Sequence, residues 1–149
     1  MTFGWINLMN GILLALMLLP NLFYALRNRG QVNRSKSRLM NVLEQIGRYG
    51  CMILMMLPLF VWKFAFKSAE GFVVYLLGNG ALLAVYLVTW LFYWKRQSKA
   101  QALILAVVPS CIFLLTGLTL RHFALVLFAV LFAVGHIYVT IKNLEEENV

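Results

Sequence analysis

The sequence predicts an all-α, polytopic membrane bundle with about five transmembrane helices. Apolar residues make up 62% of the 149 residues, charged residues make up only 12%, and the mean hydropathy is +0.83. A soluble domain carries about 25% charged residues, and a chain of this length buries only about 70% of its unfolded surface. Lipid must therefore cover much of the apolar surface, and we expect residues 1–149 to form one membrane domain.

Apolar runs long enough to cross the hydrocarbon core, about 20 residues each, mark the expected helices. They cover residues 3–26, 46–66, 72–94, 100–120 and 123–141. The last two runs form one apolar stretch, which as a single helix would be about 63 Å long, twice the thickness of the core. We therefore expect a tight hairpin at Arg121 and His122.

Basic residues fall mostly on one side of this arrangement. Ten of the 13 Lys and Arg follow the first, third or fifth helix or begin the second, namely Arg27, Arg29, Arg34, Lys36, Arg38, Arg48, Lys95, Arg96, Lys99 and Lys142. The other side holds Lys63, Lys67 and Arg121. The positive-inside rule then places the amino terminus outside and the carboxyl terminus in the cytoplasm. We expect a multi-pass protein of a bacterial inner (cytoplasmic) membrane.

The basic cytoplasmic loop, residues 27–45, runs into an amphipathic segment at 38–47. Apolar Leu39, Val42, Leu43 and Ile46 recur there at helical spacing. The segment either lies in the membrane interface or extends the second helix, and both alternatives stay open. Anionic lipid headgroups are the expected partner of this loop. Nucleic acid is not expected, because the basic residues form no continuous stripe.

Glu44 and Arg48 are four residues apart, so on a helix they share a face and can form an ion pair. We expect this pair to fix the depth of the second helix, with Arg48 reaching toward the headgroups. The alternative is a functional role, in which Glu44 accepts a proton or binds a cation and Arg48 binds an anion.

His136 is the titratable residue well inside the fifth helix, on one face with Ala129, Ala133 and Thr140. Small residues let a neighbouring helix approach, so His136 is expected to face protein. It either makes one interhelical hydrogen bond or relays protons or holds a substrate. Neither His nor Cys residues show metal-ligand spacing, and we expect no metal and no cofactor.

Asn10, Asn21 and Asn79 are amides inside apolar helices. Asn10 and Asn79 have similar expected depths, which predicts that they pair with each other and hold their helices together. A polar path lined by these amides is the alternative.

Three prolines are expected to kink helices, namely Pro20, Pro58 and Pro109. Each removes one backbone hydrogen bond and leaves the carbonyl four residues earlier without its helical donor. Such carbonyls bind ions in some transporters, although neighbouring helices usually compensate for them.

Three classes of function stay open, in this order. The first is an accessory, assembly or sensor subunit that packs against another membrane protein or a second copy of itself. The second is a small transporter or channel, and the third is an intramembrane enzyme at the cytoplasmic face. No catalytic motif is present, so an enzyme is not favoured. A cavity shared by Glu44, Arg48, Asn79 and His136 would favour the second and third classes; separate hydrogen bonds would favour the first.

Overall fold

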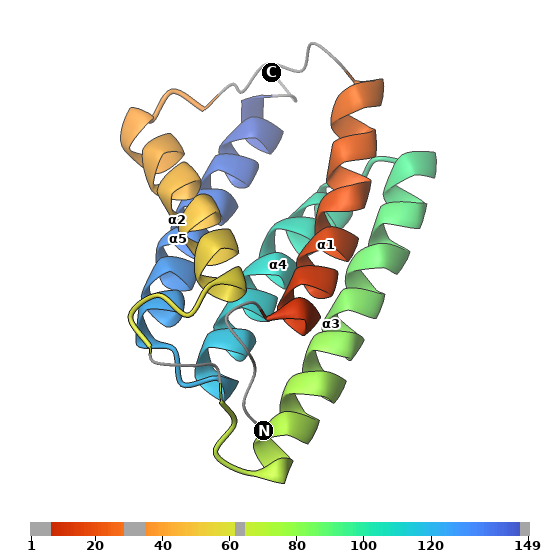
Figure 1. The fold of residues 1–149 in the computed structure, drawn as a ribbon. Coiled ribbons are helices and arrows are strands. Elements are labelled where there is room, and N and C mark those ends of the chain that lie inside the picture. Colours follow the sequence, from red (N-terminus) through yellow and green to blue (C-terminus); the bar gives the residue numbers. More distant parts are fainter. Residues whose placement is uncertain (1–6, 29–34, 62–64, 147–149) are drawn as a thin grey trace.

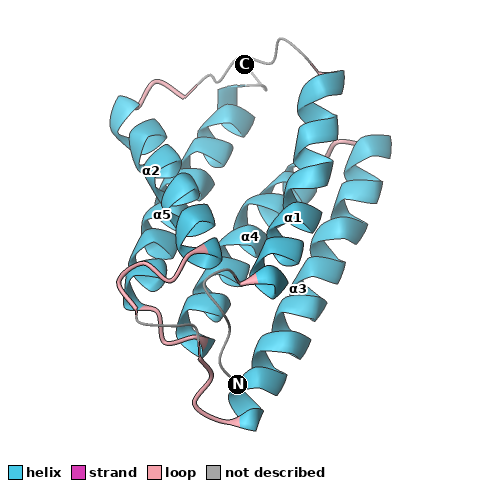
Figure 2. Ribbon diagram, viewed as in Figure 1, coloured by secondary structure: helices cyan, strands magenta, loops and turns pink. Residues whose placement is uncertain are grey.

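The computed structural model describes residues 7–28, 35–61 and 65–146, and these residues form five helices. In chain order they are α1 (Leu8–Arg27), α2 (Arg38–Met56), α3 (Ala69–Lys95), α4 (Lys99–Thr119) and α5 (Phe123–Glu146) (Figure 1). Figure 2 shows these helices joined by loops, with no strand in the described ranges. The expected all-α bundle is confirmed.

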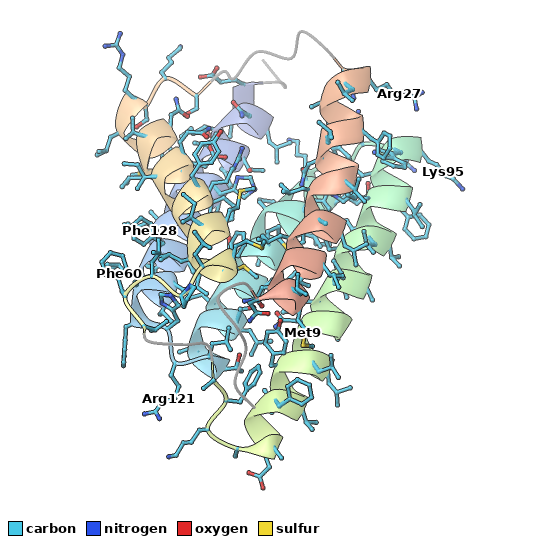
Figure 3. All side chains as sticks on the ribbon, viewed as in Figure 1. Met9, Arg27, Phe60, Lys95, Arg121 and Phe128 are labelled. Carbon is cyan, nitrogen blue, oxygen red and sulfur yellow. The ribbon has the colours of Figure 1, made fainter. Side chains whose placement is uncertain are left out.

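Four of the described helices, α1, α3, α4 and α5, are long and apolar enough to cross a membrane. The remaining helix, α2, is less apolar, since it carries Arg38, Glu44 and Arg48. Figure 3 shows Arg27 and Lys95 near one end of the bundle and Arg121 near the other. The chain is thus built as a membrane protein with basic residues at both ends, and which end faces the cytoplasm stays a prediction.

The bounds of α2 differ from the expected helix at 46–66. The helix begins at Arg38, because the Ser37 hydroxyl accepts a hydrogen bond from the Met40 N–H. It ends at Met56, because Leu57 precedes Pro58 and adopts an extended conformation. The amphipathic segment 38–47 is therefore the first half of α2, and the expected kink of a helix at Pro58 is wrong.

The hairpin between α4 and α5 is tight, and Arg121 has a positive φ of 56°. The His122 N–H donates to the Gly117 carbonyl at 2.8 Å and the Arg121 N–H to the Leu118 carbonyl at 3.1 Å, which together close the end of α4. His122 is fully buried, and its ring Nδ1 accepts a hydrogen bond from the Leu125 N–H at 3.2 Å. This histidine therefore caps the start of α5.

The core lies in the centre of the bundle, and all five helices contribute buried side chains to it, for example Leu14, Met55, Tyr86, Ile112 and Leu125. The backbone of α1 makes fewer close approaches to its neighbours than the other helices do, although its Leu13, Leu14 and Met17 side chains are buried in the core. Figure 1 shows that α1 begins, and α2 ends, at mid-height of the bundle. The two ends meet there, since the Asn7 N–H donates to the Met56 carbonyl at 3.2 Å.

Candidate functional site

Glycines bring α2 and α5 into backbone contact. A Cβ added to Gly135 of α5 would lie 2.5 Å from the backbone nitrogen of Glu44, closer than real Cβ atoms come. One added to Gly47 of α2 would overlap the backbone of Phe132, and one at Gly50 would overlap the ring of Phe128. Small residues at a crossing let helix axes approach closely. Side chains of α2 and α5 that lie beside this crossing are therefore close to one another.

Glu44 lies at this crossing and is 5% exposed. Its Oε1 accepts a hydrogen bond from Nη2 of Arg48, one turn along α2, in an ion pair. The same oxygen lies 2.9 Å from Nδ1 of His136 on α5. The structure thus gathers three of the candidate residues from two helices into one cluster, which we call the Glu44 triad (Glu44, Arg48 and His136).

The ring of His136 is held from two sides. It stacks on Phe132 with centroids 4.7 Å apart and planes 16° apart, and Phe132 in turn packs edge-on against Phe113 of α4. With Nδ1 donating to the carboxylate, Nε2 is the ring nitrogen that can accept a hydrogen bond. The Glu44–His136 distance is within the reach needed for proton transfer.

A pocket of about 610 Å³ adjoins the triad, and Arg48 and His136 line it. All five helices contribute to its wall. Its other polar lining residues are Asn21, Tyr24, Tyr86, Trp90, Tyr93 and Thr140. Much of the remaining wall is aliphatic, methionine or phenylalanine, such as Met17, Met52, Leu105 and Phe113. The site is therefore a mainly apolar cavity with a polar end.

Aromatic residues of α3 form the wall opposite α2. Tyr86, Trp90 and Tyr93 follow one face of α3, and Tyr24 of α1 packs on Trp90 with centroids 5.3 Å apart. The Tyr86 hydroxyl accepts a hydrogen bond from Asn21 Nδ2 at 2.5 Å and donates to the Met17 carbonyl at 3.3 Å. Asn21 thus lies at the pocket, where it joins α1 to α3.

The aromatic face of α3 was not predicted from the sequence. Its signal was present, because Tyr86, Trp90 and Tyr93 recur at spacings of four and three residues. An aromatic stripe is also typical of plain core or interfacial packing, so its spacing alone did not identify a pocket.

Asn10 and Asn79 do not line this pocket. The predicted pair between them is wrong, because in the described part of the chain each amide bonds to a different partner. Asn10 donates from Nδ2 to the Met55 carbonyl at 2.9 Å and accepts from the Tyr75 hydroxyl at 2.6 Å. Asn79 bonds to the Thr116 hydroxyl of α4 at 3.2 Å. Both amides therefore connect helices separately, which is the structural role that the sequence analysis favoured for them.

Two prolines lie inside helices, Pro20 in α1 and Pro109 in α4. Pro109 lines the pocket together with Leu105, whose carbonyl lacks its helical donor because proline has no N–H. Among the described residues no group of three or more His, Cys, Asp or Glu side chains is arranged to hold a metal ion.

Comparison with protein-family models, curated proteins and solved structures yields no match for this chain. Its function has to be argued from the site alone.

Proposed function

We propose that the protein is a membrane-embedded binding protein of the sensor class, whose pocket takes up a small amphiphilic molecule from the bilayer. The observation that carries the proposal is the cavity between the five helices, with the Glu44 triad at its polar end and an aromatic and aliphatic wall. A volume of about 610 Å³ lies within the ~300–1,000 Å³ that is usual for sites of small organic ligands.

The triad supports binding in a fixed orientation. Hydrogen bonds to Glu44 hold Arg48 and His136, and stacking on Phe132 fixes the imidazole further. Polar groups held in this way lose little rotational freedom when a ligand arrives, which favours affinity. The apolar wall supplies the driving force for a tail, at about 0.8 kcal/mol for each buried methylene.

Photoaffinity labelling tests the proposal. The purified protein in lipid nanodiscs is irradiated with a dodecanol that carries a diazirine in its chain, and labelled peptides are mapped by mass spectrometry. We expect labelling of pocket residues such as Met52 and Phe113 that unlabelled dodecanol competes away. Labelling confined to lipid-facing positions such as Leu77 and Val85, or labelling that is not competed, would contradict the proposal.

A matched pair of substitutions on α4 supplies the control. Ala102 lines the pocket, whereas Ala100, half a turn earlier, is exposed and does not. Ala102→Phe should fill part of the cavity and remove the competed labelling, and Ala100→Phe should leave it unchanged. Equal labelling of both variants would count against the pocket as the binding site.

A second candidate function, a small carrier, is favoured by the packing of α1. This helix forms one wall of the pocket, makes few close approaches to its neighbours and contains Pro20. A helix with few close backbone approaches and an internal proline is suited to moving aside for a ligand. Vesicles that contain the protein should then exchange a fluorescent amphiphile between leaflets faster than empty vesicles do. An equal rate would contradict the carrier function and leave the binding function as the remaining candidate.

A further inference from the structure

We propose that the pocket selects single-chain amphiphiles whose polar head is a hydroxyl group, which donates its hydrogen bond to Nε2 of His136. This inference rests on the proposed function and names the ligand class for the same site. Two features of the imidazole carry it, namely the ring nitrogen that holds the proton and the part of the ring that is accessible.

Glu44 fixes the position of the ring proton. Its Oε1 lies 2.9 Å from Nδ1 of His136, and the same oxygen accepts a hydrogen bond from Arg48. An ionised carboxylate can only accept, so Nδ1 is the nitrogen that donates. Because the Glu44 and Arg48 charges cancel, a second ring proton would leave a net positive charge beside a mainly apolar cavity, which desolvation disfavours. Nε2 is therefore an acceptor.

The accessible part of the imidazole includes Nε2. The Nδ1 edge lies against Glu44, and one ring face stacks on Phe132. The His136 side chain is 21% exposed and lines the pocket. In the described part of the chain, Nε2 has no hydrogen-bond partner and is not one of the enclosed polar atoms that lack one. A donor that reaches this nitrogen from an apolar cavity makes a stronger hydrogen bond than it would in water.

Donors lie beside this acceptor in the pocket wall. Thr140 follows His136 by one turn of α5, and Arg48 lies on the facing helix; both line the pocket. A hydroxyl group has one donor and two acceptor lone pairs. Such a head can therefore donate to Nε2 while it accepts from Thr140 or from a remaining N–H of Arg48.

Other heads match the wall less well. A carboxylate presents only lone pairs to Nε2, and the Arg48 charge that would attract it is already paired with Glu44. A quaternary ammonium has no donor, and the described pocket wall contains no Asp or Glu to neutralise it. An ether oxygen accepts but cannot donate. The O–H donor is therefore the group that this site distinguishes.

The experiment compares three dodecyl probes that carry the same diazirine in the chain and differ only in the head, which is an alcohol, its methyl ether or a carboxylate. Each probe is titrated against the protein in nanodiscs at about pH 7.5, above the ordinary pKa of histidine. Concentrations are expressed per lipid, so that unequal partitioning into the bilayer cancels. We expect half-maximal pocket labelling at a concentration about fivefold lower for the alcohol than for the methyl ether or the carboxylate.

A substitution assigns this preference to the imidazole. His136→Phe keeps a ring that can stack on Phe132 and leaves Glu44 paired with Arg48, but it removes Nε2. The advantage of the alcohol over the ether should be lost. Tyr138→Phe is the matched control on the same helix, since Tyr138 does not line the pocket, and should leave the advantage unchanged. A merely structural role of His136 would weaken both probes alike.

A second measurement leaves His136 in place. The chain has two histidines, so in His122→Asn the only imidazole is that of His136. Nitrogen NMR of this ring in nanodiscs should show a protonated Nδ1 and an unprotonated Nε2. Addition of dodecanol should shift the Nε2 signal, and addition of its methyl ether should not.

The outcomes separate the two proposals. The hydroxyl inference is overturned by equal labelling with alcohol and ether, by strongest labelling with the carboxylate, by an alcohol preference that survives in His136→Phe, or by an Nε2 that carries the ring proton. Each of these results leaves the binding function standing. Absence of competed pocket labelling with every head overturns the proposed function itself.

Discussion

Glu44 and His136 are 92 positions apart in the chain, yet Oε1 of the carboxylate lies 2.9 Å from Nδ1 of the imidazole. The residue next to the histidine, Gly135, packs on the backbone nitrogen of the same glutamate. The polar contact and the closest helix crossing are therefore one structural unit. A substitution that widens the α2–α5 crossing should therefore disturb the Glu44 triad. A substitution in the triad should likewise disturb the crossing.

Gly135→Ala should destabilise the bundle by about 1–3 kcal/mol, because the added methyl group has no room against the α2 backbone. Gly80→Ala is the matched control on α3, where a Cβ would meet nothing within 4 Å. Alanine there should be neutral or stabilising by up to about 1 kcal/mol, through its higher helix propensity. Thermal unfolding in detergent, followed by circular dichroism, measures both. Equal effects of the two substitutions would contradict the close crossing.

Glu44→Gln and Arg48→Gln should each destabilise the protein by about 1–3 kcal/mol, because each removes one partner of a partly buried ion pair. The double variant should cost less than the sum of the single ones, by about 1 kcal/mol or more, since no lone charge is left at the crossing. Unfolding free energies of the four proteins in one detergent form the cycle. Additive effects would show that the pair contributes nothing.

Acidification should destabilise the α4–α5 hairpin through His122. Burial lowers the pKa of this histidine below its ordinary value, and its unprotonated Nδ1 caps α5. A group with a lowered pKa in the folded state stabilises the fold above its ordinary pKa and loses that contribution as the pH falls through the lowered value. The melting temperature should therefore drop below about pH 6.

His122→Asn is the control for this titration. Asparagine caps a helix well and does not ionise in this range, so the acid-dependent part of the melting curve should shrink. An unchanged pH profile in the variant would assign the effect to another group.

The orientation predicted from charge can be tested with cysteines placed at opposite ends of the bundle. In a chain whose Cys51 and Cys111 are replaced by serine, Ser98→Cys should be protected from an impermeant thiol reagent in intact cells. Lys67→Cys should react with it. The opposite pattern would invert the topology and place the basic end outside.

The sequence predicted the helices best where apolar length alone decides them. The expected run 72–94 corresponds to Ala69–Lys95, and the hairpin at Arg121 and His122 lies where the apolar stretch became too long for one helix. The sequence was less informative for α2. Its apolar run continues past Pro58, whereas the helix begins at the Ser37 cap and ends before Pro58.

The candidate site was predictable in part. The spacing of Glu44 and Arg48 indicated their pair, and the small residues around His136 indicated a side chain directed at protein. Depth suggested that Asn10 would meet Asn79, but depth does not specify which helices are neighbours or how each is rotated. The pocket beside Trp90 depends on those rotations and on how closely α1 approaches its neighbours, and neither can be read from a single sequence.

The mid-height junction of α1 and α2 makes the bundle different in its two halves. Below it, α3, α4 and α5 continue as the remaining described helices, and Asn10 bridges the Met55 carbonyl and the Tyr75 hydroxyl beneath the cavity. The two leaflets of a bilayer would therefore meet unlike surfaces, one formed by all five described helices and the other mainly by α3, α4 and α5. A ligand of the proposed pocket would therefore enter from the leaflet that surrounds α1 and α2, because residues of both helices line the cavity.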